Sequence, residues 1–367
     1  MTAKLKAAGQ DHVLTPPPAA ERKASFLQQL QSLDLDGLPR MLQTSLNADV
    51  SKREVEPFTA EALSELSDSA VAACRQVGLE VIAKGQVAAL LLAGGQGTRL
   101  GTSAPKGCYD IGLLSGKSLF QYHAERLRKV KQLAAALTAK TEAEVRLPLL
   151  IMTSDATDAA TRDFFETHKH FGLPPDEVLF FQQGMLPCLT PEGKLLLDSP
   201  GQLAMAPNGN GGVYVSLRDS ALDSLTEWGT TSVFQFGVDN ILCHVADPTF
   251  IGYCLSKGAD CASKTVAKSH AHEPVGALAQ VDGAPAVVEY SEISAVCTEI
   301  TLHIVSRRLL LMTAGTFHRR WPSRPARRAA SPTARRTSAS TTSQPPSSAT
   351  SAKRSSTPCR CMSRARR

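Results

Sequence analysis

The chain has 367 residues, of which 43% are hydrophobic and 20% are charged, and its formal net charge is +6. This length allows one large domain or two to three smaller ones, with a core that needs no disulfide support. The longest apolar run, residues 87–93, is far shorter than a bilayer span and excludes an integral membrane protein.

Residues 1–85 are predicted to form a helical N-terminal region. The first 15 residues lack the apolar segment of a signal peptide, and the nine cysteines show no paired spacing. We therefore expect reduced thiols in a cytosolic or nuclear compartment, and we place the protein in the cytoplasm. A helix is predicted over 20–33, where apolar side chains recur on one helical face at Phe26, Leu27, Leu30 and Leu33. A second helix is predicted over 59–83, because carboxylates follow Thr59 at the positive end of the helix dipole.

Residues 86–294 are predicted to form the core. Short apolar runs alternate there with helical segments. The predicted strands are 87–92, 147–153, 178–182, 232–238 and 286–290, and the predicted helices include 119–133 and 161–170. This alternation predicts an α/β fold of three layers around a mixed, mostly parallel sheet.

Residues 295–367 are predicted to form a divergent, mostly disordered basic tail. Hydrophobic periodicity fades beyond Met312, and such a segment buries too little apolar surface to offset its chain entropy. Residues 318–367 hold 13 of the 40 Lys and Arg and no acidic residue, which leaves 27 basic groups beside 34 acidic groups elsewhere. The body of the chain is therefore mildly acidic, and the overall charge does not indicate nucleic-acid binding.

A glycine-rich turn directly after the predicted strand 87–92 carries the strongest chemical signal. It reads Gly94-Gly95-Gln96-Gly97-Thr98-Arg99, and Pro105-Lys106-Gly107 follows. Glycines let the backbone approach a ligand, successive N–H groups can bind an anion, and Arg99 and Lys106 add positive charge. The pattern favours a nucleotide phosphate site, and a simple tight turn is the alternative.

Two common phosphate motifs do not fit this region. Gly95, Gly97 and Gly101 are spaced G-x-G-x-x-x-G, one residue too many for the Rossmann fingerprint. The segment 112–118 has three residues between its glycines where a P-loop has four, and it follows no good strand. The region therefore matches neither of these two motifs.

The glycine-rich turn and five later blocks together resemble a known family. The blocks are FFQQGMLPCL (180–189), MAPNGNGGVY (205–214), residues 236–266, EPVGALAQVDG (273–283) and VVEYSEIS (287–294). Over about residues 20–294 the chain resembles the eukaryotic UDP-N-acetylhexosamine (UDP-N-acetylglucosamine) pyrophosphorylases, within the UDPGP-type uridylyltransferases. The resemblance implies a Rossmann-like, GT-A-like nucleotidyltransferase core. It also implies the Mg²⁺-dependent reaction of UTP with N-acetylglucosamine 1-phosphate to UDP-N-acetylglucosamine and pyrophosphate.

The resemblance also implies roles for the glycine-rich segment. The backbone platform for the uridine nucleotide would be Leu92, Ala93, Gly94 and Gly95. The triphosphate would be wrapped by Gly97, Thr98 and Arg99. Lys106 would neutralise its charge, which makes Arg99 and Lys106 the expected catalytic cations; a solvated loop lysine is the alternative for Lys106.

Later blocks supply the expected contacts to the base and the sugar. Gln183 matches a residue that hydrogen-bonds uracil, and an amide offers both a donor and an acceptor to an imide edge. Gly209 would lie against the nucleotide, and Asn210, Glu289 and Tyr290 would contact the sugar. Taken alone, these residues also fit a surface glutamine, an Asn-Gly turn and an ordinary strand end.

Asp239 follows the apolar strand 232–238, and ligands of α/β proteins bind at the carboxyl ends of strands. Mg²⁺ prefers few carboxylates plus substrate phosphates, so Asp239 is the expected magnesium ligand, direct or through water, with a turn cap as the alternative. The nine cysteines and the histidines show no zinc-ligand spacing.

The chain departs from the family after residue 294. The family would continue to an Asn-Ala-Gly-Asn turn and a stretch with ligand-binding lysines, whereas residues 313–316 read Thr-Ala-Gly-Thr. We hypothesise a frameshift, a mis-spliced transcript or a wrong gene model near residue 295. The alternatives for function are an inactive truncated product, a uridylyltransferase for another sugar 1-phosphate such as glucose 1-phosphate, and an RNA-binding basic tail, which the scarcity of aromatics disfavours.

Overall fold

The structure is a computed structural model that describes residues 1–15, 17–46, 53–58, 60–98, 101–209, 211–266, 270, 273, 275–288 and 305–313. All of these residues belong to one compact unit, residues 1–323. Within the described part, no helix is long and apolar enough to cross a membrane. The predicted boundaries at residues 85 and 294 stay predictions.

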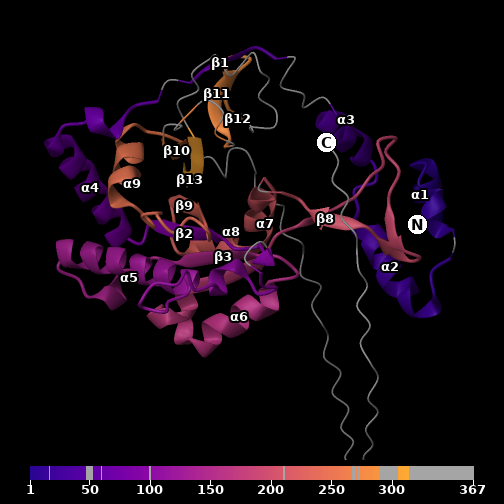
Figure 1. Ribbon diagram of the computed structural model, residues 1–367, viewed down its shortest axis with the longest axis horizontal. Helices are drawn as coiled ribbons and strands as arrows, with labels where there is room; N and C mark the ends of the chain where they lie inside the picture. Colours follow the sequence, from indigo (N-terminus) through magenta and orange to yellow (C-terminus); the bar gives the residue numbers. More distant parts are fainter. Residues whose placement is uncertain are drawn as a thin grey trace, which may run out of the picture. The chain divides into compact units, whose positions relative to one another are not determined.

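The main sheet of the described residues has nine strands (Figure 1). Four parallel strands form its site-bearing part in the order β9, β2, β3, β4. They are β9 (Ser232–Gly237), β2 (Val87–Leu92), β3 (Leu149–Thr153) and β4 (Val178–Gln182). Antiparallel strands continue the sheet beyond β9: β13 (Val305–Thr313), β10 (Cys261–Val266), β11 (Ala277–Val281), β12 (Ala284–Val288) and β1 (Val55–Pro57). The predicted α/β fold with a parallel sheet is confirmed.

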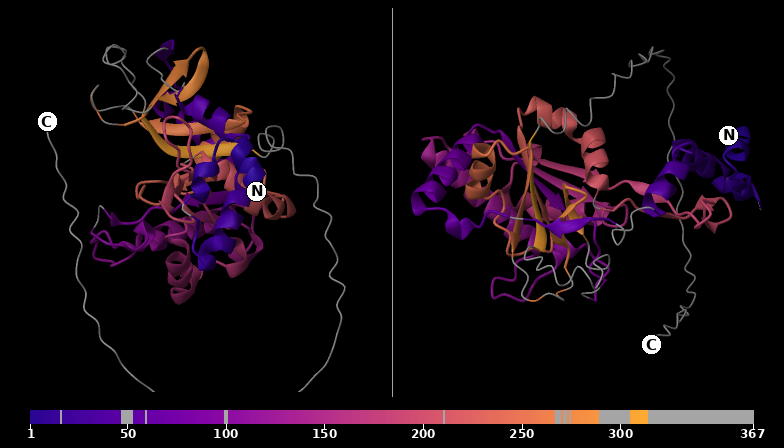
Figure 2. Two further views of the ribbon diagram at one scale, coloured as in Figure 1. Left: turned by 90° about the vertical axis from the view of Figure 1, so that its right-hand side faces the viewer. Right: turned by 90° about the horizontal axis from the view of Figure 1, so that it is seen from above.

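Strand β2 shows why this sheet lies between two layers of helices. Its side chains alternate between two cores, with Leu91 facing one and Leu90 facing the other, and both are fully buried. The core on the Leu91 side is built with α4 (Asp68–Ala83), α5 (Leu119–Leu137), α6 (Asp158–Thr167) and α9 (Pro248–Ser256). The core on the Leu90 side is built with α7 (Gly212–Ser220) and α8 (Leu222–Glu227). Helices lie on both sides of the sheet when it is seen from above (Figure 2). A strand covered on both faces requires a continuous apolar run, which β2 has.

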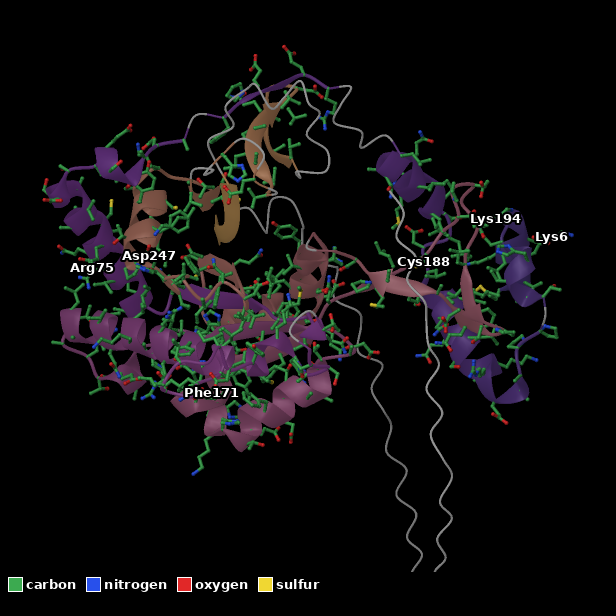
Figure 3. All side chains as sticks on the ribbon, viewed as in Figure 1. Lys6, Arg75, Phe171, Cys188, Lys194 and Asp247 are labelled. Carbon is green, nitrogen blue, oxygen red and sulfur yellow. The ribbon has the colours of Figure 1, made fainter. Side chains whose placement is uncertain are left out.

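A third core joins the N-terminal helices to an insertion between β4 and α7. The helices are α1 (Thr2–Ala7), α2 (Ala20–Ser32) and α3 (Leu38–Leu46), and the insertion contains β5 (Met185–Pro187), β6 (Leu197–Ser199), β7 (Gln202–Leu203) and β8 (Met205–Pro207). The fully buried Phe26 and Leu30 of α2 pack there with Leu195 and Leu203 of the insertion. Lys194 donates a hydrogen bond to the carbonyl of Gly9 at 2.6 Å, beside the helix that carries Lys6 (Figure 3).

Several predicted boundaries need correction. The helix predicted from Thr59 begins at Asp68, because the hydroxyl of Ser67 caps it by accepting from the N–H of Ala70 at 3.2 Å. The helix predicted over 161–170 is α6, which ends at Thr167. The chain then takes left-handed φ values of 51° to 53° over residues 169–171, a conformation that no right-handed helix can continue.

The remaining elements lie close to their predicted positions. Strands β2 and β4 have the predicted bounds, β3 begins two residues later than predicted, and β9 ends one residue earlier. Helix α5 extends to Leu137, four residues past its predicted end. The last predicted core strand is β12, two residues earlier than predicted. Helix α2 ends one residue before its predicted end, and Leu27 within it and Leu33 directly after it are half-buried rather than buried.

Residues 305–313 form a strand within the predicted tail 295–367, ahead of the point beyond Met312 where hydrophobic periodicity fades, and the prediction for the tail as a whole stays a prediction. These nine residues form β13, which pairs with β9 on one side and with β10 and β11 on the other. In the antiparallel ladder, Leu310 lies opposite Gln235 and Thr313 lies opposite Ser232. The run Leu309–Met312 is apolar enough to form a strand, so the change of sequence after 294 hid an element of the sheet. The rest of 295–367 lies outside the described residues.

Candidate nucleotide site

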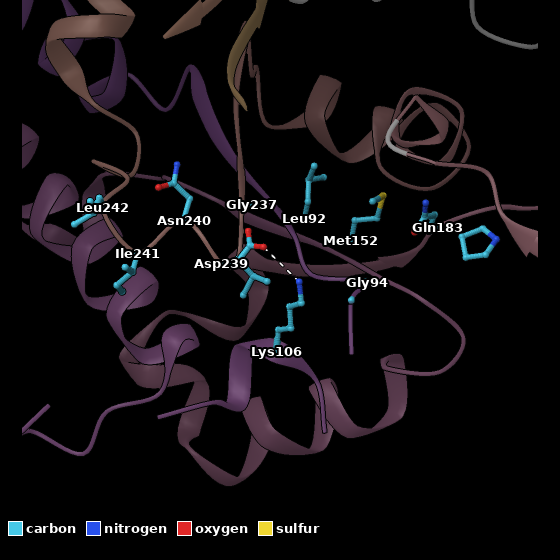
Figure 4. Close-up of a pocket in the computed structure, with 13 residues that line it drawn as sticks. Leu92, Gly94, Lys106, Met152, Gln183, Gly237, Asp239, Asn240, Ile241 and Leu242 are labelled. Atoms are coloured by element: carbon cyan, nitrogen blue, oxygen red, sulfur yellow. Dashed lines mark hydrogen bonds and ion pairs between the residues drawn. The ribbon is translucent and has the colours of Figure 1, made fainter. Parts of the chain in front are cut away.

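A cavity of about 790 Å³ lies at the carboxyl ends of the four parallel strands (Figure 4). Each of these strands or the turn that follows it contributes to the wall. The lining residues are Leu92, Gly94, Gly95, Lys106, Met152, Gln183, Pro207, Gly237, Val238, Asp239, Asn240, Ile241 and Leu242. This is the edge of an open α/β sheet at which ligands bind.

The glycine-rich turn after β2 folds back so that Lys106 lies over Gly95. A β-bridge joins Gln96 to Pro105, and the N–H of Lys106 donates to the carbonyl of Gly95 at 3.2 Å. A Cβ at Gly95 would lie 3.5 Å from Cδ and Cε of Lys106. The stem of Lys106 therefore passes over Gly95 at ordinary contact distance.

The position of Lys106 depends on its neighbour Gly107. Gly107 is buried against the ring of Phe120 on α5, and a Cβ at Gly107 would lie 2.1 Å from Cζ of that ring. Phe120 is fully buried, so its ring has little freedom to move away. Close contact between backbone and ring thus fixes the short segment that carries Lys106.

Lys106 and Asp239 form an ion pair at the cavity, with 3.4 Å between Nζ and Oδ2 (Figure 4). The Asp239 side chain is 68% exposed and that of Lys106 is 29% exposed. An ion pair this open contributes little to stability. Its two charges are instead available to a ligand, the ammonium to phosphate oxygens and the carboxylate to a metal cation.

Gln183 lies at one end of the cavity in Figure 4, directly after β4. Its Nε2 donates to the carbonyl of Gly209 at 2.8 Å, and its backbone N–H donates to the carbonyl of Thr153 at 2.8 Å. Oε1 faces Gly94, where a Cβ would lie only 3.1 Å from it. Gly209 has a φ of +69°, which glycine adopts without strain. The side-chain amide is thereby oriented by its donor, and its oxygen is left as an acceptor.

Two buried or half-buried side chains outside the predicted set hold the turns of this site. The hydroxyl of Ser154 donates to the carbonyl of Gly94 at 2.7 Å. No motif marks Ser154, although a polar residue directly after the predicted strand 147–153 is a signal for a ligand edge. The other side chain is His123, whose Nε2 makes a hydrogen bond of 2.9 Å with the carbonyl of Val238. Burial lowers the pKa of His123 to about 4, although this hydrogen bond by itself raises the pKa.

Two cysteine thiols near the site are poor nucleophiles. Burial raises the pKa of Cys108, two residues after Lys106, to about 11. Burial likewise raises the pKa of Cys243, which follows the Asp239 turn, to about 12. Both thiols therefore stay protonated at neutral pH, and the thiolate is the form that attacks an electrophile.

Comparisons with known proteins show the family of the chain. The family model described as UTP–glucose-1-phosphate uridylyltransferase matches residues 37–308. The chain belongs to this family. The match reaches into β13, past residue 294 where the resemblance read from the sequence stopped.

Several relatives in this family have names that refer to N-acetylated sugars. The UDP-N-acetylhexosamine pyrophosphorylase-like protein 1 of Mus musculus is 43% identical over 306 residues, which cover 80% of this chain and 60% of that protein. The UDP-N-acetylglucosamine pyrophosphorylase of Saccharomyces cerevisiae is 46% identical over 221 residues, or 60% of this chain and 45% of that protein. The chain thus spans 45 to 60% of the length of these two curated relatives.

A solved member of the family has a closely similar fold. The uridine diphosphate N-acetylglucosamine pyrophosphorylase of Trypanosoma brucei, crystallised with an inhibitor, superimposes with a TM-score of 0.75 at 33% identity. The similarity covers 85% of this chain and 65% of that one. This similarity agrees with the α/β fold and parallel sheet described above.

The structure brings together most of the described residues that the resemblance singles out. Those that line the cavity are Leu92, Gly94, Gly95, Lys106, Gln183 and Asp239. Gly209 joins them through its hydrogen bond with Gln183, whereas Ala93 and Gly97 are buried in the turn and Thr98 is exposed on it. The other predicted site residues, Arg99, Asn210, Glu289 and Tyr290, lie outside the described residues. The functional roles of all of them stay predictions.

Proposed function

We propose that the chain is a UTP:N-acetylglucosamine-1-phosphate uridylyltransferase that forms UDP-N-acetylglucosamine and pyrophosphate. One observation carries the proposal: the Lys106–Asp239 pair lies beside the glycine-rich turn, at the carboxyl edge of the parallel sheet. Both charges and the turn line one cavity, which has the volume of a typical small-molecule site. The names of the relatives support N-acetylglucosamine 1-phosphate as the second substrate.

Two separate groups of the cavity suit the base and the phosphates of UTP. Nε2 of Gln183 is engaged by Gly209, so its Oε1 is free to accept the N3–H of uracil. Lys106 lies between Gln183 and Leu242 in Figure 4, and a lysine ammonium is a point charge suited to phosphate oxygens. The glycines between them let the backbone approach the nucleotide.

The reaction needs no covalent protein nucleophile. An oxygen of the sugar phosphate attacks the α-phosphorus of UTP, and the bond to the pyrophosphate oxygen breaks. Negative charge moves to the leaving pyrophosphate, where the Lys106 ammonium would compensate it. Phosphoryl-type transfers depend mainly on positioning and charge stabilisation, which are what the fixed turn and the lysine supply.

Mg²⁺ is part of the proposal. Among the described residues that line the cavity, Asp239 is the acidic one, and most of its side chain is exposed. Mg²⁺ in nucleotide sites is bound through one or two carboxylates, with phosphate oxygens and waters as the other ligands, so Asp239 fits. When bound, the ion would neutralise phosphate charge. The role of Asp239 is to hold that ion near the triphosphate while Lys106 stays beside it.

Glucose 1-phosphate is the second candidate substrate, because the family model is described by that sugar. The test is pyrophosphate release by the purified 367-residue chain with UTP, Mg²⁺ and a panel of sugar 1-phosphates. We expect release with N-acetylglucosamine 1-phosphate to exceed release with glucose 1-phosphate, and Lys106→Ala to abolish it. Faster release with glucose 1-phosphate would refute the proposed substrate. No release from folded protein would favour an inactive truncated product.

We also propose a cytoplasmic location. The supporting observation is that six cysteines of the described residues, Cys74, Cys108, Cys188, Cys243, Cys254 and Cys261, are free thiols. Disulfides form in oxidising compartments and are rare in the cytosol. Fractionation of cells that express the tagged chain tests this location, and recovery in a secreted fraction would contradict it.

A further inference from the structure

Helix α5 contacts both segments that carry the Lys106–Asp239 pair. Its first turn holds Phe120, which packs against Gly107 next to Lys106. One turn later, His123 donates from Nε2 to the carbonyl of Val238 at 2.9 Å. A carbonyl only accepts, so Nε2 carries the proton of the ring. Side chains three residues apart lie on one side of a helix, so one face of α5 contacts both segments.

Arg126 extends this set of contacts by one further turn. Its Nη1 donates to the carbonyl of Ile241 and, at 3.3 Å, to the carbonyl of Cys243. Together with His123, it engages three carbonyls in the segment 238–243, which contains Asp239 and lines the cavity. Charge-assisted hydrogen bonds of this kind are stronger than neutral ones, so the segment is firmly held.

The exposed ion pair cannot hold this geometry by itself. Nζ and Oδ2 are 3.4 Å apart, and the Asp239 side chain is mostly in solvent. Such a contact is weak in water. His123, in contrast, is 1% exposed and packs edge-on against Phe236 of β9, with ring centroids 5.1 Å apart. The position of Asp239 is therefore fixed by contacts with α5 rather than by its ion pair with Lys106.

We propose that His123 and Arg126 are positioning residues that hold Asp239 at its separation from Lys106. Helix α5 then sets the spacing of the two charges that meet the triphosphate and its cation. The inference rests on the proposed function for its effect on turnover. Its structural part, that these two side chains hold segment 238–243, stands independently.

The variants separate positioning from stability. Arg126→Met keeps the apolar stem and removes both donated hydrogen bonds, and Arg126→Lys keeps one cationic donor. His123→Leu removes the donor, whereas His123→Gln keeps an N–H. The matched control is Arg128→Met, an arginine of the same helix whose Nε lies 3.5 Å from the Glu142 carboxylate. The readouts are hydrogen exchange of amides 238–243, kcat and KM with UTP and N-acetylglucosamine 1-phosphate, and thermal unfolding.

We expect Arg126→Met and His123→Leu to speed exchange over 238–243 at least about tenfold and to lower kcat about 10- to 100-fold, since displacements near 1 Å can cost that much. Arg126→Lys and His123→Gln should recover part of the loss, and Arg128→Met should change neither readout. Normal kcat in folded Arg126→Met and His123→Leu would overturn the inference. Unchanged hydrogen exchange of amides 238–243 in these two variants would also overturn the inference. This exchange measurement tests the structural part even if the wild-type chain shows no turnover. If Arg126→Met does not fold, the same criteria apply to Arg126→Lys.

Discussion

Gly107→Ala tests how the backbone places Lys106. An added Cβ would lie 2.1 Å from Cζ of Phe120 and 2.2 and 2.3 Å from its two Cε atoms, whereas ordinary contacts begin at 3.4 Å. Ring and backbone must therefore separate by more than 1 Å. The ring is fully buried and packs edge-on against Phe165 with centroids 5.0 Å apart, so the segment 105–108 has to move instead.

The expected magnitude follows from this overlap. Overpacking of a core by one methyl group costs about 1–3 kcal/mol. For a domain of this size, that loss lowers Tm by roughly 2–12 °C. Movement of Lys106 by about 1 Å should lower kcat about 100-fold at temperatures where the protein stays folded.

The assay compares kcat at 25 °C and Tm for the wild-type chain, Gly107→Ala, Phe120→Leu and the double variant. A smaller side chain at residue 120 makes room for the new methyl group, so the double variant should regain part of the activity that Gly107→Ala loses. Wild-type kcat and Tm in Gly107→Ala would refute the reasoning. Equal losses in the single and double variants would show that the ring is not the obstacle.

Three further predictions concern stability. Lys131→Met should lower the free energy of unfolding, measured by urea titration, by about 3–5 kcal/mol. The reason is that the buried Glu177, whose carboxylate lies 2.9 Å from Lys131 Nζ, would lose its counter-charge. An unchanged urea midpoint would contradict this. Gly78→Ala should lower Tm, because its Cβ would lie 1.9 Å from the carbonyl oxygen of Pro248. It should not lower kcat at 25 °C, because neither residue lines the cavity. A raised Tm would show that helix propensity outweighs the clash. The pKa of His123 is about 4 in the folded chain, and its ordinary value is 6.5. Between these two pH values the unfolded chain binds more protons than the folded chain, so a fall in pH destabilises the fold. Wild-type stability should therefore fall by about 3 kcal/mol more than that of His123→Gln as pH drops from 6.5 to 4, and parallel curves for the two proteins would contradict the buried, neutral ring.

Local sequence pattern was enough to predict the elements that frame the site. The apolar run 87–92 is uninterrupted because β2 is covered by helices on both faces, and such runs are readable from composition. Of the glycines after it, Gly94 is the one where a Cβ would be crowded, 3.1 Å from Oε1 of Gln183. The glycine pattern predicted that the backbone of this turn is open to the close approach of a ligand.

Contacts between distant segments could not be predicted in this way. The ion pair joins residues 133 positions apart, and His123 reaches a carbonyl 115 positions away. The local sequence around each residue does not show which distant residue it contacts. The contacts of His123 with Val238 and of Ser154 with Gly94 are therefore seen only in the fold. Strand β13 was missed for a related reason: its partner β9 precedes it by about 70 residues, and only that pairing shows that the apolar run 309–312 is part of the sheet.

Whether the 790 Å³ cavity holds UTP is tested most directly by calorimetric titration of the full chain with UTP in Mg²⁺. We expect UTP to bind more tightly than CTP, whose base lacks the N3–H that Oε1 of Gln183 would accept. Lys106→Ala should weaken binding about 10- to 100-fold, the value of one hydrogen bond to a charged group. Asp239→Ala should remove most of the difference between titrations with and without Mg²⁺. UTP binding that is unchanged in both variants would contradict the placement of the nucleotide at this edge of the sheet.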